Sequence, residues 1–164
     1  MSNTSDRELV FHRSFKAPRE LVFEAWTNPN HVVHWFGPKG FTNTIREMSV
    51  KPGGVWRFVM HGPDGTDYPN KIVFKEVVKP SLLTFDQGWD VDGFSNDPGK
   101  FEVVVNFEAK GNTTVLTMKM TFKSKEAKDE VVEKYRAIEG HKQTMDKLEE
   151  YLTGMVNVYK SEHI

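Results

Sequence analysis

The sequence predicts an α+β fold in which a curved antiparallel sheet wraps around one long C-terminal helix. Between residues 44 and 123 apolar residues alternate with polar ones, as in half-buried strands. From Lys125 onward they recur every third or fourth residue, as on one face of a helix. A sheet with one apolar face must bury it, and only helices remain to cover it. The 164 residues fit one domain, so we expect a single domain over residues 1–164, with a core at about 9–159.

The first part of the chain predicts a strand followed by two short helices. Residues 9–15 alternate and place Arg13 on the same face as their apolar members. Pro18 suits the first turn of a helix, and apolar residues at helical spacing continue this helix to Trp26. Asn30 can then cap a second short helix.

Six further strands are expected between residues 44 and 123. Turn residues separate them at 51–54, 62–65, 79–80 and 110–112. The last two strands, near residues 101–107 and 116–122, show the clearest alternation, with one apolar and one polar face. We therefore expect an antiparallel sheet with one side buried.

The C-terminal segment predicts a helix that begins at Lys125 and is interrupted near Gly140. If the helix is continuous from residue 137 to 159, it is about 34 Å long at 1.5 Å per residue and crosses a small sheet. Its apolar stripe consists of Val131, Tyr135, Ile138, His141, Met145, Leu148, Leu152, Met155 and Tyr159.

Composition excludes several classes of protein. Without cysteine the chain has no disulfide, no zinc ribbon and no thiolate nucleophile, which fits a reducing compartment, so we expect a cytoplasmic protein. A net charge of -1 provides no basic field, so we expect no nucleic-acid partner. We see no signal peptide and no run of about 18 apolar residues, so we expect no membrane span.

Motifs for known chemistry are missing. The sequence has no phosphate-binding glycine loop, no nucleophile elbow and no dinucleotide fingerprint. His61 ends a strand before a turn, where a surface role is more common than a general base. We expect no cofactor and no catalytic residue, although an enzyme without a recognised motif remains an alternative.

Two segments were considered as metal sites. His31 and His34 lie three residues apart and can share a metal, but no third ligand is evident. The loop at residues 90–97 is acidic, but Phe94 stands where a calcium loop needs an oxygen. A surface histidine pair and a solvated loop are the favoured interpretations, and we expect no metal.

Several sequence blocks resemble one family. They are residues 15–29 (FKAPRELVFEAWTNP), 35–38 (WFGP), 52–54 (PGG) and 60–65 (MHGPDG). These blocks resemble the activator of Hsp90 ATPase homologue (AHSA-like) family of the START-like (SRPBCC) superfamily. The resemblance extends over about residues 9–152 and implies the helix-grip (START-like, Bet v 1-like) fold. The chain has Gly140-His141 where this family usually has Gly-Trp, so we expect His141 to face the sheet beside a larger or wetter pocket.

A straight helix on a curved sheet leaves space along part of its length, so we expect an apolar pocket there. Arg13 can anchor a ligand carboxylate there, or form an internal ion pair with an acid such as Glu47, or extend to the sheet end. The residues that we expect to line the pocket are Arg13, Trp35, Trp56, Phe58, Met60, Phe74, Phe85, Trp89, Phe101, Val103, Val105, Met118, Met120, His141 and Met145.

Three functions follow from these expectations. The first is a protein that binds a small apolar or amphipathic ligand, lipid-like or aromatic, in the pocket. The second, implied by the family resemblance, is a module that binds a chaperone. The third is an enzyme that uses the same pocket. An exposed apolar or charged patch would favour the second over the first.

Overall fold

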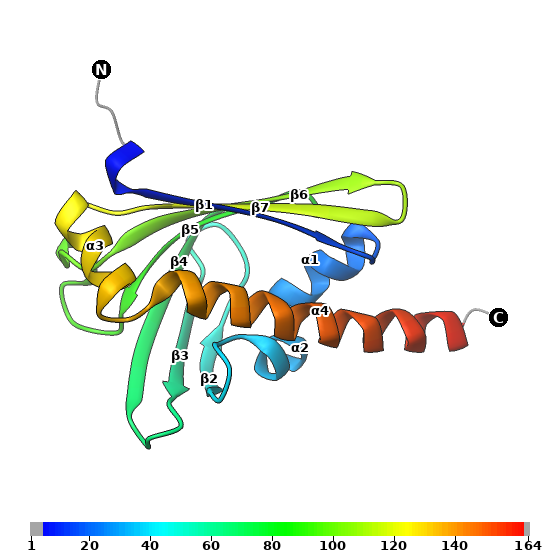
Figure 1. Ribbon diagram of the computed structural model, residues 1–164, viewed down its shortest axis with the longest axis horizontal. Helices are drawn as coiled ribbons and strands as arrows, with labels where there is room; N and C mark the ends of the chain where they lie inside the picture. The colour runs from blue at the N-terminus through cyan, green and yellow to red at the C-terminus, as the bar shows by residue number, and fades with distance from the viewer. Residues whose placement is uncertain (1–4, 163–164) are drawn as a thin grey trace.

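The computed structural model describes residues 5–162 and confirms the expected arrangement (Figure 1). One strand and two short helices precede six strands and two further helices. The elements are β1 (Glu8–Phe15), α1 (Arg19–Thr27), α2 (Pro29–Trp35), β2 (Thr42–Met48), β3 (Val55–His61), β4 (Asp67–Val78), β5 (Leu82–Trp89), β6 (Phe101–Lys110), β7 (Thr113–Thr121), α3 (Lys125–Glu133) and α4 (Ala137–Glu162).

All seven strands form one antiparallel sheet in the order β1-β7-β6-β5-β4-β3-β2. The first strand therefore pairs with the last, and the six later strands form a simple meander. Register places Phe11 and Val105 on either side of Met118, which aligns the apolar positions of three strands on one face. Bulges interrupt β2 near Ile45 and β4 near Phe74, and bulges of this kind bend a sheet.

The second helix begins differently from the expectation. Asn28 is its cap, and the Asn28 side chain accepts a hydrogen bond of 2.9 Å from the backbone N–H of Asn30. Asn30 was expected to be the cap, but Pro29 takes the first helical position, since it has no N–H to leave unpaired. The helix therefore starts earlier.

Helix α4 crosses the concave face of the sheet (Figure 1). Its 26 residues correspond to about 39 Å of helix. Met145, Leu148 and Leu152 are buried on its sheet-facing side, in one core cluster with α1 and the strands. The side chain of Tyr159, expected in the same stripe, lies outside the described residues.

The break between the last two helices lies before Gly140, where the interruption was expected. Helix α3 ends at Glu133 and α4 starts at Ala137, with Arg136 in the left-handed region at φ 52°. Gly140 lies inside α4, where an added Cβ would lie 3.3 Å from Cγ of Pro38. The interruption is therefore a turn at Arg136, and Gly140 allows α4 to approach the Pro38 side chain closely. Within residues 5–162, none of the helices has the length and hydropathy of a membrane span.

Candidate binding cavity between the sheet and helices α3 and α4

Two adjoining hollows separate the sheet from α3 and the start of α4. The inner hollow, about 230 Å³, lies beneath the first turns of α4. The outer hollow, about 740 Å³, lies between α3 and the ends of β3, β4, β5 and β6. Four residues belong to the walls of both: Pro38, Met60, Gln87 and Tyr135. We call the two hollows together the sheet–helix cavity.

Methionine dominates the inner hollow. Met60, Met118, Met120 and Met145 reach it from β3, β7 and α4. Methionine is unbranched and polarisable, so its side chain adapts to the shape of a neighbour. The inner wall can therefore change shape more easily than one built of branched or aromatic side chains.

The outer hollow has an aromatic sheet side and a polar helix side. Tyr68 of β4 and Trp89 of β5 stack on each other, with ring centroids 6.2 Å apart. Ala127 faces them from α3, a helix with no buried residue. Glu130 and Lys134 of this wall are both exposed, so the mouth is charged while the sheet side is mainly aromatic.

His141 lies on the inner wall and faces the sheet, as expected from its place in the helical stripe. Its ring stacks on Phe11 of β1, with centroids 3.8 Å apart and an interplanar angle of 18°. Burial, helped by the charge of Arg13, lowers the pKa of His141 from 6.5 to about 4. The imidazole is therefore uncharged at neutral pH.

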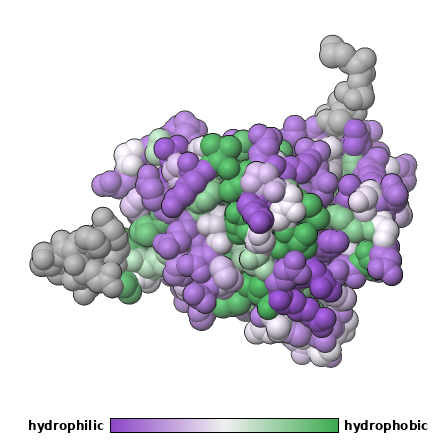
Figure 2. Space-filling view, turned by 180° about the vertical axis from the view of Figure 1, so that it is seen from behind, coloured by the Kyte–Doolittle hydropathy of each residue, from purple (hydrophilic) through white to green (hydrophobic). Residues whose placement is uncertain are grey.

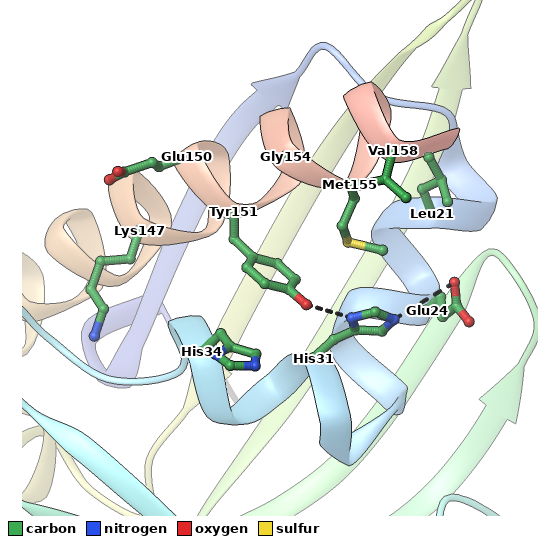
Figure 3. A pocket seen from close by; sticks show the side chains of 10 residues that line it. All are labelled: Leu21, Glu24, His31, His34, Lys147, Glu150, Tyr151, Gly154, Met155 and Val158. Carbon is green, nitrogen blue, oxygen red and sulfur yellow. Dashed lines mark hydrogen bonds and ion pairs between the residues drawn. The ribbon is translucent and has the colours of Figure 1, made fainter. Parts of the chain in front are cut away.

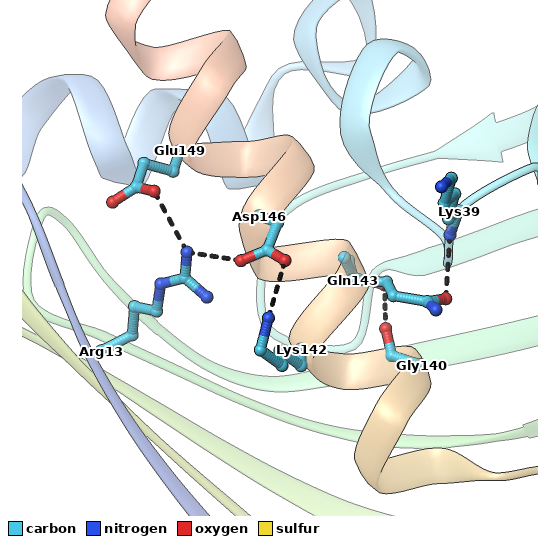
Figure 4. Close-up of polar contacts among 8 residues, drawn as sticks. Arg13, Lys39, Gly140, Lys142, Gln143, Asp146 and Glu149 are labelled. Carbon is cyan, nitrogen blue, oxygen red and sulfur yellow. Dashed lines mark hydrogen bonds and ion pairs between the residues drawn. The ribbon is translucent and has the colours of Figure 1, made fainter.

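Arg13 forms an internal ion pair. Its Nη2 donates to Asp146 at 2.8 Å and to Glu149 at 3.2 Å, both on α4 (Figure 4). Hydrogen bonds from Arg13 and Lys142 hold the pKa of Asp146 below its ordinary value. The partners differ from the suggested Glu47, whose carboxylate lies 3.9 Å from Arg57 instead. Arg13 belongs to neither hollow and ties β1 to α4.

The cavity brings together about half of the residues expected to line it. Those that do line it are Met60, Trp89, Phe101, Met118, Met120, His141 and Met145. Apart from Arg13, the others lie in the closed core, each at most 2% exposed: Trp35, Trp56, Phe58, Phe74, Phe85, Val103 and Val105. They face inward as expected, but neighbouring aromatic rings fill the space next to them, for example Phe36 against Trp56 and Phe58.

Sequence reasoning missed two polar groups of the cavity. Gln87 lies between Phe85 and Trp89 at an inward position of β5, and this break in the apolar alternation is the signal that could have found it. Trp26 was assigned to helix packing. It does contact Trp35, yet it also lines the inner hollow, and its buried Nε1 has no hydrogen-bond partner among the described residues.

The polar residues considered for chemistry are engaged elsewhere. His61 contacts Asp67 at 2.7 Å and Thr44 at 2.8 Å across neighbouring strands. Asp90 of the acidic loop accepts a hydrogen bond of 2.8 Å from Arg57. Among residues 5–162, no three histidine or acidic side chains are placed to hold one metal ion.

Comparison with known proteins identifies the family. The family described as "Activator of Hsp90 ATPase homolog 1-like protein" matches residues 16–153, most of the chain. The chain belongs to this family. A comparison with curated proteins gives no match.

Solved structures of similar proteins share the fold. A protein from Arthrobacter aurescens is 23% identical with a TM-score of 0.83, over 94% of this chain and 90% of its own. A protein from Mycobacterium smegmatis is 24% identical with a TM-score of 0.82, over 94% and 96%. An AHSA1 protein from Silicibacter pomeroyi is 22% identical with a TM-score of 0.72, over 89% and 97%. At these identities the likeness shows the helix-grip fold, a curved antiparallel sheet around a long C-terminal helix, and nothing finer.

Proposed function

We propose that this protein binds a small apolar or amphipathic molecule in the sheet–helix cavity. The observation that carries the proposal is the pair of adjoining hollows of about 230 and 740 Å³. Ligand pockets usually measure about 300–1,000 Å³ and combine apolar walls with a few polar groups. Methionine walls around Gln87 and His141 fit that description.

The charges around the cavity favour an uncharged inner part of the ligand. His141 is neutral at pH 7, and Arg13 is committed to Asp146 and Glu149. A buried carboxylate would therefore find no free cation beside it, and an unpaired buried charge is costly. We place the apolar part of the ligand against the methionines, and any charged group at the mouth near Lys134.

Native mass spectrometry of gently purified protein, followed by titrations with fatty acids, aromatic acids and flavonoids, tests this proposal. Trp26 and Trp89 line the cavity, so their fluorescence reports occupancy. Ala127→Phe adds a ring to the cavity wall, whereas Glu133→Phe adds the same ring elsewhere on α3. We expect saturable binding by the wild type and Glu133→Phe, and binding at least tenfold weaker by Ala127→Phe.

Either of two results would contradict the proposal. One is the lack of any co-purifying mass together with the lack of a saturable change for the whole panel. The other is equal affinity of Ala127→Phe and Glu133→Phe. Both variants should retain the far-ultraviolet circular dichroism of the wild type, because each replaces a residue on a helix without buried side chains.

A second candidate function is a chaperone-binding module, which the family name suggests. Tyr135 and Ile138 are 42% and 48% exposed beside the junction of α3 and α4. On the face seen in Figure 2, groups of apolar residues lie among hydrophilic ones. A purified chaperone that binds the empty protein, with loss of binding in Ile138→Asp, would favour this function over the first.

A further inference from the structure

A groove lies between α1, α2 and the C-terminal half of α4. Its volume is about 880 Å³, and its walls share no residue with the sheet–helix cavity. Leu21 and Glu24 of α1 and His31 and His34 of α2 form one side. The face of α4 between residues 147 and 158 forms the other side (Figure 3). We call it the helical groove.

Three side chains form a polar chain across the helical groove. The hydroxyl of Tyr151 lies 2.5 Å from Nδ1 of His31, and Nε2 of His31 lies 4.0 Å from a carboxylate oxygen of Glu24. The ring of Tyr151 also stacks on His34, with centroids 5.4 Å apart and an interplanar angle of 15°. Figure 3 shows Tyr151 reaching from α4 toward both histidines. The phenol and imidazole are therefore held in fixed positions.

Tyr151 and His31 share the hydrogen bond at the centre of the groove, and Glu24 stands apart from it. Burial, and then the charge of Glu24, raises the pKa of Tyr151 above its usual value, so the phenol keeps its proton. Nδ1 of His31 and the Tyr151 hydroxyl therefore satisfy each other in one hydrogen bond. Nε2 of His31 lies 4.0 Å from Glu24, which is too long for a hydrogen bond, so the Glu24 carboxylate has no side-chain donor from the groove wall.

The remaining charged groups of the wall do not supply that donor. Nζ of Lys147 donates to the backbone carbonyls of Phe41 and Pro38 at 3.3 and 3.5 Å. In Figure 3 the side chains of Lys147 and Glu150 both extend away from His31. The centre of the groove therefore presents the Glu24 carboxylate beside the aromatic rings of His31 and Tyr151, a setting that attracts a cation.

Glycine keeps the apolar end of the groove open. Gly154 lies inside α4, and a Cβ added there would meet nothing within 4 Å. Glycine inside a helix costs about 1 kcal/mol relative to alanine, so local stability disfavours it here. Leu21, Met155 and the 58% exposed Val158 provide apolar surface around this space. The groove thus has an acceptor end and an apolar end.

We propose that the helical groove is a second binding site, for a small cationic amphiphile. Its ammonium group donates to the Glu24 carboxylate, at the acceptor end of the groove. Its alkyl tail lies along Leu21, Met155 and Val158, in the space that Gly154 leaves. This site is independent of the sheet–helix cavity and of the function proposed for it.

Nuclear magnetic resonance titration with three eight-carbon probes tests the site: octylammonium chloride, sodium octanoate and octanol. We expect octylammonium to shift backbone amides of residues 21–34 and 147–158 saturably. Glu24→Gln removes the charge while keeping the shape and should weaken binding about tenfold or more, since hydrogen bonds to charged groups are the strong ones. Ala127→Phe, in the other cavity, should leave octylammonium binding unchanged.

A matched pair of variants on α4 tests the geometry. Gly154→Leu should fill the groove and abolish binding, whereas Asn157→Leu, at an exposed position outside the groove walls, should not. Leucine favours helix and enters open space at position 154, so the variant should fold. The proposal is overturned if octanoate or octanol shifts the same amides equally, if shifts are confined to the sheet–helix cavity or missing, or if Glu24→Gln binds like the wild type.

Discussion

The two halves of α4 pack against the same sheet in different ways. Leu148 and Leu152 of the C-terminal half are at most 2% exposed and meet a closed core. In the N-terminal half, His141 and Thr144 line a hollow instead. Continuous burial along a helix therefore does not follow from a continuous apolar stripe.

The difference comes from what lies beside each half. Helix α1 contributes four buried residues, among them Phe23, whose ring meets Phe107 of β6 with centroids 5.3 Å apart. Helix α3 contributes none. The sheet is covered by two well-packed helices at one end and by one poorly packed helix at the other, and the sheet–helix cavity lies at the second end.

The largest effect should separate the two halves directly. Leu148→Ala removes a fully buried side chain from the closed core and should lower the free energy of unfolding by roughly 2–5 kcal/mol. Met120→Ala acts beside an existing hollow, at a half-buried position, and should cost only about 1 kcal/mol. Urea denaturation of both variants measures this. Similar losses would mean that both halves are equally packed.

Acid should act on the N-terminal half through His141. Its folded-state pKa of about 4 lies below the ordinary 6.5, so between these values the unfolded chain binds the proton more readily. Stability present above pH 6.5 should therefore fall by roughly 3 kcal/mol as the pH falls to about 4.

His141→Phe provides the control, because a phenylalanine keeps a ring against Phe11 without a titrating group. Chemical denaturation between pH 4 and 7 should show a shallower decline for this variant than for the wild type. Carboxylates titrate equally in both proteins, so their contribution cancels in the difference. Parallel curves would refute the assigned burial of the imidazole.

A third test concerns the border between hollow and core. Val103 is fully buried between Phe85 and Met120 in register and belongs to neither hollow. Val103→Phe should therefore overpack the core and cost roughly 1–3 kcal/mol in a thermal or urea melt. Unchanged or raised stability would mean that the cavity extends beneath β6.

The sequence predicted most of the fold because periodicity and turn chemistry are local signals. Alternation in residues 101–107 and 116–122 identified β6 and β7, and helical spacing identified α4. The family blocks supported the same arrangement. The cap of α2 is Asn28 rather than the expected Asn30, because both residues suit a cap and the proline between them decides.

The site was less predictable because it depends on contacts between distant elements. Inward-facing positions such as Phe74 and Met60 look alike in the sequence, but the first is core and the second lines the cavity. Which positions remain open depends on where the chain breaks before α4. Arg136 at this break adopts a left-handed backbone conformation, and nothing in the sequence indicates that conformation. The helical groove was missed because its two sides lie more than a hundred residues apart along the chain.

The smallest expected effect compares the two glycines of α4. Gly154→Ala places a methyl group in open space and should raise the free energy of unfolding by about 0.5–1 kcal/mol, since alanine loses less backbone entropy in a helix. Gly140→Ala makes the same chemical change in the other half, where the new Cβ would lie 3.3 Å from Cγ of Pro38. The proline ring must then move, which should cancel some or all of the gain. Paired urea melts measure the difference, and equal gains would show that the start of α4 is held less closely against the loop after α2 than Gly140 indicates.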